Sequence, residues 1–163
     1  MAVELFRIDD RLIHGQVTVG WTQPLGVRFI SLVDDDIAAS DWEQELYKMA
    51  VPAGVDLYFD TVESAVRRLP EYLADVRKGI VLTGSVQTMR RIVDGSRRVP
   101  TVNIGGVHHR AGRQERLRYV FLTPDEERDL RAIADAGVEV TAQDLPGATP
   151  VPLSQLVSAE SAA

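Results

Sequence analysis

The stretch that organises this sequence is Arg7-Ile8-Asp9-Asp10-Arg11-Leu12-Ile13-His14-Gly15-Gln16-Val17. It follows an apolar run, Val3–Ile8, that predicts a first strand. It precedes Gln16–Leu25, where apolar residues recur every fourth position, as on the buried face of a helix. An open α/β sheet places its binding and catalytic groups in loops at the carboxyl ends of its strands. We therefore expect the chemistry of this chain to begin in this loop.

Strands and helices alternate along the rest of the chain. Further strands are predicted at Val27–Val33, Val55–Phe59, Gly79–Thr83, Pro100–Ile104 and Val138–Ala142. Helices are predicted after the capping residues Ser40, Ser85 and Thr123 and over Val62–Leu69, which Pro70 interrupts; Asp94-Gly95 stops the helix after Ser85. This order predicts an α/β fold with an open, mainly parallel sheet flanked by helices on both faces.

One further segment, Leu117–Leu122, predicts a strand that cannot follow the parallel pattern. Its link to the preceding strand is too short for a helical crossover, so we expect it to run antiparallel at one edge of the sheet. No linker or repeat divides the chain. We expect a single domain over residues 1–163, with a frayed tail at 158–163.

Composition excludes several classes of function. The net charge of −6 argues against a general binder of nucleic acid or of membrane surfaces. The chain has no cysteine, which excludes disulfides, thiolate metal sites and cysteine nucleophiles. No apolar run approaches the ~20 residues that a membrane-spanning helix needs, and no signal peptide begins the chain.

Charge is distributed unevenly. Residues 34–45 contain six acidic residues and no base, and residues 108–118 contain four arginines, two histidines and one acid. Such runs are usually solvated surface. The alternatives are a divalent-ion site at Asp34-Asp35-Asp36 and a docking face or anion site in the basic run.

Three unusual loops are expected to meet at one edge of the sheet, because the carboxyl ends of parallel strands share an edge. They are Asp9–Gly15, Thr83-Gly84-Ser85 and Gly105-Gly106-Val107-His108. Two of these loops also open helices, whose first N–H groups are unpaired and favour an anion. A phosphoryl group is the natural candidate.

The residues of the first loop suit phosphoryl transfer. His14 can attack phosphorus through one neutral ring nitrogen, while Asp10 or a backbone carbonyl holds the other nitrogen as a donor. Arg11 can neutralise charge on the transferred group, and Gly15 keeps side chains away from it. The alternatives are a capping or core histidine and a local ion pair between Asp10 and Arg11.

The other two loops offer weaker candidates. Ser85 and Thr83 have hydroxyl groups for the phosphate, although Ser85 can also be a simple helix cap. His108 and His109 are interpreted as structural or interface residues. No metal or cofactor is required, because a phosphohistidine donor supplies the phosphoryl group directly.

The motif resembles the signature of a known family. Arg7 to Val17 with Trp21, followed by Val33-Asp34-Asp35, Val51 to Val55 and Val102 to Gly106, is similar to the IIB subunits of the mannose/fructose/sorbose class of bacterial sugar phosphotransferase systems. The resemblance implies a cytoplasmic domain whose histidine, at the position of His14, takes phosphate from the phosphohistidine of a IIA domain. That histidine then passes the phosphate to a sugar entering through the membrane subunits IIC and IID.

On this hypothesis Arg11, Asp10, Gly15, Gln16, Ser85 and Thr83 form the setting of the His14 phosphate. A homodimer is suggested by the resemblance alone. Two alternatives stay open. One is a stand-alone regulatory phosphocarrier without sugar transport. The other is a nucleotide- or flavin-binding domain, which is weakened by the absence of a Gly-x-Gly-x-x-Gly or Walker lysine pattern.

Overall fold

The computed structural model describes residues 2–157. Its main sheet has seven strands in the order β3-β2-β4-β1-β5-β8-β9, and a separate two-stranded sheet pairs β6 with β7. The strands are β1 Val3–Ile8, β2 Val27–Val33, β3 Asp56–Asp60, β4 Lys78–Thr83, β5 Thr101–Ile104, β6 Gln114–Leu117, β7 Val120–Leu122, β8 Glu139–Ala142 and β9 Val151–Pro152.

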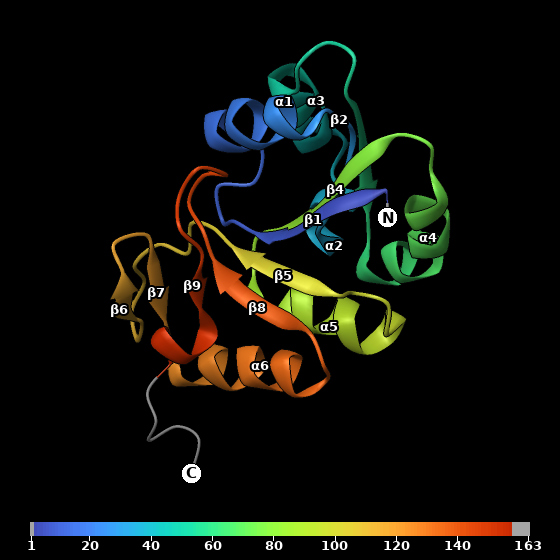
Figure 1. The fold of residues 1–163 in the computed structure, drawn as a ribbon. Helices are drawn as coiled ribbons and strands as arrows, with labels where there is room; N and C mark the ends of the chain where they lie inside the picture. Colours follow the sequence, from blue (N-terminus) through green and yellow to red (C-terminus); the bar gives the residue numbers. More distant parts are fainter. Residues whose placement is uncertain (1, 158–163) are drawn as a thin grey trace.

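The helices follow the strands in alternation (Figure 1). They are η1 Gln16–Trp21, α1 Thr22–Leu25, α2 Asp35–Ala38, α3 Asp41–Ala50, α4 Val62–Ala74, α5 Val86–Ser96, α6 Pro124–Asp135 and η2 Leu153–Gln155. Every pairing in the main sheet is parallel except that of β8 with β9. The predicted α/β class and its mainly parallel sheet are therefore confirmed.

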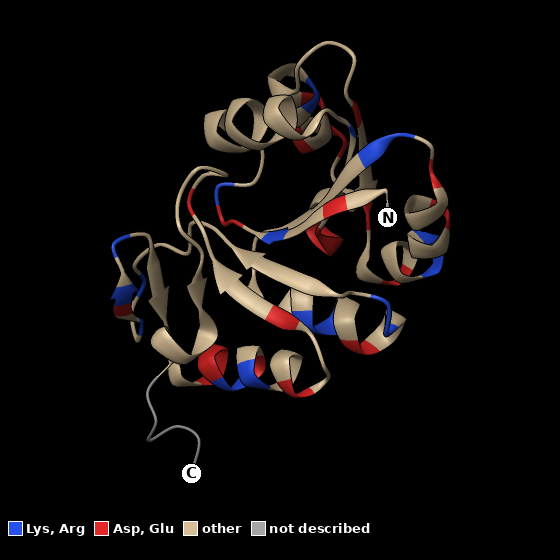
Figure 2. Cartoon of the chain, viewed as in Figure 1, with Lys and Arg blue, Asp and Glu red and all other residues tan. Residues whose placement is uncertain are grey.

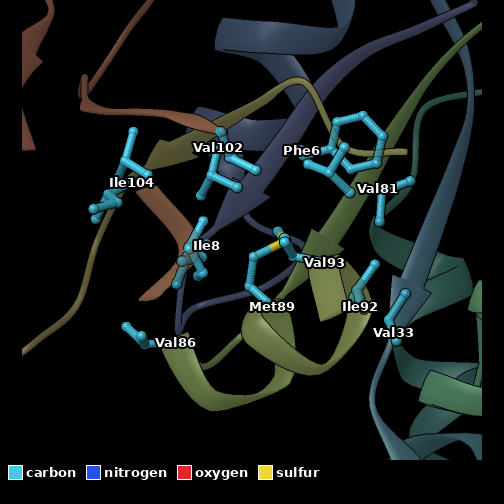
Figure 3. Packing of buried hydrophobic residues seen from close by; sticks show 14 of the residues in the cluster. Phe6, Ile8, Val33, Val81, Val86, Met89, Ile92, Val93, Val102 and Ile104 are labelled. Carbon is cyan, nitrogen blue, oxygen red and sulfur yellow. The ribbon is translucent and has the colours of Figure 1, made fainter. Parts of the chain in front are cut away.

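Helices cover both faces of the sheet. One buried cluster joins the sheet to α4, α5 and α6, and a second joins it to η1, α2 and the partly buried side of α3. Figure 3 shows how α5 packs Val86, Met89, Ile92 and Val93 toward the strands. Because β1 lies at the centre and is covered on both sides, the loop that follows it starts from a rigid base.

The strand register brings the predicted loops together. Ile8 of β1 lies opposite Thr83 of β4 and Ile104 of β5, so three strands end at the same level. The Asp9 N–H donates to the Thr83 carbonyl at 2.9 Å, and the Gly105 N–H donates to the Ile8 carbonyl at 2.7 Å. The three loops therefore begin side by side.

The antiparallel edge strand is not the one that the sequence indicated. Leu117–Leu122 does not join the main sheet as a strand; it spans the turn of the β6–β7 hairpin, which touches the neighbouring loop through a bridge between Val107 and Val120. The antiparallel edge of the main sheet is β9, which pairs with β8.

Several helix boundaries differ from the sequence prediction. Gly95 lies within α5, which ends at Ser96 with Arg97 in the left-handed region. Pro70 lies inside α4 without ending it. Ser40 precedes α3 but its side chain forms no capping hydrogen bond, whereas the capping box of Thr123 and Glu126 is complete.

The two tryptophans differ in burial, and the helices are short. Trp21 is buried, whereas Trp42 on α3 has 68% of its surface exposed. Among residues 2–157, no helix is long and apolar enough to cross a membrane. The predicted fraying of the tail concerns residues 158–163, which lie outside the described part of the chain.

Candidate functional site

Asp9 is the centre of the site. The residue is fully buried at the end of β1, and its carboxylate is surrounded by donors from β1 and from its own loop. Arg7 Nη2 lies 3.3 Å from Asp9 Oδ2, and Arg11 approaches Asp9 Oδ1 through its backbone N–H at 3.2 Å and its Nε at 3.3 Å. His14 Nε2 lies 3.2 Å from Asp9 Oδ2. One carboxylate therefore holds two guanidinium groups and one imidazole.

The surroundings of Asp9 fix its ionisation. Burial alone raises the pKa of a carboxyl group, but the close contacts to His14 and Arg11 and the charge of Arg7 outweigh burial here. Together they hold the pKa of Asp9 well below its usual range. Asp9 is thus a fixed negative charge beneath the imidazole ring at every physiological pH.

The two nitrogens of His14 have different environments. The backbone N–H of Gln16 donates to Nδ1 at 3.2 Å, so Nδ1 is an acceptor and carries no proton. The proton of the neutral ring is therefore on Nε2, the buried nitrogen that faces Asp9. The Nε2 contact lies within ion-pair distance but misses the alignment of a good hydrogen bond. The side chain of His14 keeps 17% of its surface exposed.

Arg7 supports the site from below. Its guanidinium is fully buried and reaches the Asn103 side chain, the backbone carbonyls of Gln143 and Asp144 at 2.9 and 3.2 Å, and Asp9. It also lies 4.9 Å from the ring centre of Trp21. Arg7 therefore joins β1, β5 and the loop after β8 beneath the carboxylate.

Arg11, Gly15 and Gln16 surround His14 on the solvent side. The side chain of Arg11 is about one-third exposed, and its guanidinium donates to the side-chain oxygen of Gln16. A Cβ added to Gly15 would point into open space. These three predicted site residues lie together beside His14, and the space at Gly15 leaves room for an approaching group.

Asp10 lies elsewhere than predicted. Asp10 or a backbone carbonyl was expected to hold the second nitrogen of the His14 ring, and Asp9 is the group that faces that nitrogen instead. The Asp10 carboxylate binds His108, accepting from its backbone N–H at 2.7 Å and lying 2.6 Å from its Nδ1. Asp10 therefore connects the first loop to the loop after β5.

Thr83 and Ser85 have structural contacts. Thr83 is buried, and its carbonyl accepts from the backbone of Asp9. The hydroxyl of Ser85 caps α5 by accepting from the Thr88 N–H at 3.0 Å and donates to the Thr88 hydroxyl. Gly84 between them lies against Leu12 and Asp10, so the loop borders the site.

Leu12 shows how the loop turns. It has φ of 58°, in the left-handed region that residues with side chains rarely adopt, yet its side chain is buried in the core. Such a conformation costs of order 1–3 kcal/mol and persists where the surroundings enforce it. The strained residue lies between Arg11 and His14 and sets their relative direction.

The charged runs are largely engaged in structural contacts. Asp34 caps α2, and Asp35 binds the Val62 N–H and Arg91. In the basic run, Arg113 forms a two-point ion pair with Glu126, and Arg116 pairs with Glu127. No cluster of three or more metal-ligating side chains occurs within residues 2–157.

Comparison with known proteins finds similar chains. The family described as PTS system sorbose subfamily IIB component matches residues 3–163. The chain is 34% identical over 144 residues to the N-acetylgalactosamine-specific phosphotransferase enzyme IIB component 1 of Escherichia coli, an alignment of 88% of this chain and 90% of that protein. It is 32% identical over 134 residues to the mannose-specific EIIAB component of Escherichia coli, an alignment of 81% of this chain and 40% of that protein.

A solved structure is also similar. The crystal structure of the IIB domain of the sorbose permease from Klebsiella pneumoniae superposes with a TM-score of 0.85 at 28% sequence identity. The superposition covers 95% of this chain and 96% of that chain. Sequence and fold comparisons therefore point to one family.

Proposed function

Because the chain belongs to the sorbose subfamily of phosphotransferase-system IIB components, a family of phosphocarriers in sugar uptake, we propose that His14 carries the phosphoryl group on Nδ1. The observation that supports this assignment most strongly is the asymmetry of the ring. Nε2 is buried and faces the fixed charge of Asp9, while Nδ1 has its lone pair on the side of Gln16 and Gly15. The proton-free nitrogen is the one that can attack.

The transfer step balances with the groups present. The Gln16 N–H first releases His14 Nδ1. The freed lone pair of Nδ1 then forms a bond to phosphorus as the bond between phosphorus and the donor's imidazole nitrogen breaks. The electron pair of the broken bond stays with the donor imidazole. The His14 ring keeps its proton on Nε2 and becomes cationic, and Asp9 stabilises this charge as a buried carboxylate stabilises an imidazolium in hydrolases. Arg11 and the Gln16 N–H then face the phosphoryl oxygens.

In the second transfer His14 is the phosphoryl donor instead of the acceptor. A sugar hydroxyl oxygen attacks phosphorus and loses its proton to solvent water. The phosphorus–Nδ1 bond breaks, its electron pair returns to Nδ1, and the ring becomes neutral with its proton on Nε2. Asp9 thus stabilises the cationic, phosphorylated ring more than the neutral, free ring. This difference suits a carrier that must hold the phosphoryl group and then release it. No metal or organic cofactor enters either step.

The partners follow from the family. Family members work with IIA and with the membrane subunits IIC and IID. The mannose-specific relative is an EIIAB component, which supports a IIA phosphohistidine as donor. The acceptor on our proposal is a sugar presented by IIC and IID at the cytoplasmic side of the membrane. A stand-alone regulatory carrier would accept phosphate from IIA in the same way and pass none to sugar.

The proposal is tested by incubating the full chain with a phosphorylated IIA protein and measuring its intact mass. One phosphoryl group should be gained, the label should be acid-labile and alkali-stable, and peptide mapping should place it on His14. Label on another residue, or none with a IIA that phosphorylates a known IIB, would contradict it. Membranes containing IIC and IID, added with sugar, then separate the transport role from the regulatory one.

The exposed arginines of the basic run provide a further prediction. Basic residues gather on the β6–β7 hairpin and the loop before it (Figure 2). Because Arg113 and Arg116 are held by α6, only Arg110 and Arg118 of the four remain to meet a partner. We expect the double charge reversal Arg110→Glu/Arg118→Glu to raise the KM for phosphorylated IIA roughly tenfold, mostly through slower association at low salt. Steady-state kinetics at two salt concentrations check this, and an unchanged KM would make these arginines plain surface.

A further inference from the structure

His108 lies at the same edge of the sheet as His14, on the loop after β5. Its side chain is half exposed, while that of Asp10, its partner, is 11% exposed. The Asp10 carboxylate receives both the backbone N–H and the Nδ1 of His108, at 2.7 and 2.6 Å. A carboxylate accepts and does not donate, so the proton of this contact resides on His108 Nδ1.

A second connection reinforces the first. The Asp10 N–H donates to the carbonyl of Gly106 at 2.8 Å, two residues before His108. Asp10 thus binds the loop after β5 through its backbone and its carboxylate together. The loop itself is held to α6, because Arg113 donates to the His108 carbonyl at 2.7 Å and pairs with Glu126. The first loop is therefore bound to the loop after β5, which α6 holds in place through Arg113.

The contacts of Asp10 with His108 and Gly106, here called the clasp, lie beside the groups that surround the His14 ring. A Cβ built on Gly106 would lie 2.9 Å from His108 Cε1, 3.2 Å from Arg11 Nε and 3.2 Å from Asp9 Oδ1. Those three atoms therefore share one small space, and only a glycine leaves it open. Any movement of the His108 ring changes the room available to Arg11 and Asp9.

We propose that His108 is a positioning residue for phosphoryl transfer, acting through Asp10 to hold Arg11 and His14 in register. The proposal rests on His14 being the phosphate carrier. The clasp fixes Asp10, which immediately precedes Arg11, and so limits the rotation of the guanidinium that faces the phosphoryl oxygens. The strained backbone at Leu12 needs such restraint on its amino-terminal side, because an unrestrained loop would relax toward a common conformation.

Three substitutions separate the routes by which His108 could act. Asparagine places an amide N–H where His108 Nδ1 lies and keeps the contact to Asp10. Glutamine places its amide near the position of Nε2, which is not used in the clasp. Alanine removes both. All three keep the backbone N–H that donates to Asp10.

The experiment measures transfer from phosphorylated IIA to the full chain, with kcat and KM determined separately. We expect His108→Ala to lower kcat roughly 10-fold to 100-fold with little change in KM, since small misplacement of a reacting group has effects of that size. His108→Asn should restore most of the lost rate, and His108→Gln should not. The matched control is His109→Ala, because His109 is exposed and packs edge-on against Phe121 outside the clasp.

Every other pattern overturns the proposal. Rescue by glutamine instead of asparagine would indicate a direct role of Nε2 on the phosphoryl group. A change confined to KM would indicate partner docking. Unchanged kcat in His108→Ala would make the clasp a structural detail. Thermal unfolding of each variant controls for loss of fold, and wild-type chain that fails to label on His14 would refute the carrier role rather than the clasp.

Discussion

The His14→Gln variant is expected to accept no phosphate from phosphorylated IIA while keeping its fold. Glutamine places an amide nitrogen near the position of Nε2 and can still donate to Asp9, but it offers no nucleophilic nitrogen. The ring is partly exposed and lies in a loop, so we expect the free energy of unfolding to change by about 1 kcal/mol or less. Intact-mass measurement and a thermal melt of the same sample check both statements.

The outcome has a matched control in the same loop. Gln16→Ala removes the side chain that Arg11 contacts and leaves the Gln16 N–H that donates to Nδ1. This variant should label on His14, although more slowly. Label retained in His14→Gln at a measurable rate would show that another residue carries the phosphate.

The Asp9→Asn variant is expected to show the second large effect. The carboxylate stabilises the cationic ring formed on phosphorylation, and an amide at this place cannot. Replacing the carboxylate that orients a catalytic histidine lowers kcat by about 10⁴-fold in a serine protease. We expect a loss of roughly 10²-fold to 10⁴-fold here, measured as the rate of transfer from phosphorylated IIA, with KM little altered.

The same substitution should destabilise the fold. Asp9 and Arg7 are both fully buried, and removal of one partner of such a pair costs about 3–5 kcal/mol because the other charge stays behind. Arg7 keeps its contacts to Asn103 and two carbonyls, which favours the lower end of that range. Urea unfolding at pH 7 measures the difference, and transfer assays at low temperature keep the variant folded.

The difference in unfolding free energy between wild type and Asp9→Asn should depend on pH in a defined direction. The pKa of Asp9 is lower in the folded chain than its unfolded value of about 3.9. A carboxyl group of this kind contributes stability above its unfolded pKa and loses that contribution as pH falls toward the folded pKa. The gap in unfolding free energy between wild type and Asp9→Asn should therefore be constant from neutral pH to about pH 5 and shrink below about pH 4. A gap that widened in acid would contradict the ionised state of Asp9.

Much of the fold was predictable because local signals and burial agree. β1 and β2 were predicted with the observed boundaries, since their apolar runs end where the buried sheet ends. The capping box of Thr123 and Glu126 predicted the start of α6, because its local hydrogen bonds form as the sequence indicates. The antiparallel edge was misplaced because Leu117–Leu122 contains a turn at Arg118-Tyr119 that no glycine or proline marks.

The structure brings the predicted residues Arg11, His14 and Gln16 together, but their contacts could not be predicted from the sequence. Two adjacent carboxylates, Asp9 and Asp10, are equivalent in the sequence, and the strand pleat decides which one points inward beneath His14. The role of Arg7 could not be predicted from the motif, because the partners of an arginine in an apolar strand are unknown until β5 and the loop after β8 are placed beside it. The charged residue inside a predicted buried strand was the available signal.

His108 shows the same limit at longer range. Its partner Asp10 lies 98 residues earlier, and only the parallel pairing of β1 with β5 brings the two loops together. In the sequence, a histidine beside a second histidine in a basic segment has the pattern of solvated surface residues. The pairing of strands, not the spacing of residues, reveals the clasp.

The most direct test concerns which nitrogen of His14 bears the phosphate. The full chain, labelled with ¹⁵N in its histidine rings and phosphorylated by IIA, can be studied by phosphorus–nitrogen correlation NMR in alkaline buffer. The phosphorus should couple to Nδ1, with the proton on Nε2 shifted by the neighbouring Asp9 carboxylate. Coupling of phosphorus to Nε2 would mean that the buried nitrogen is the nucleophile and would contradict the arrangement of Asp9, His14 and Gln16 described above.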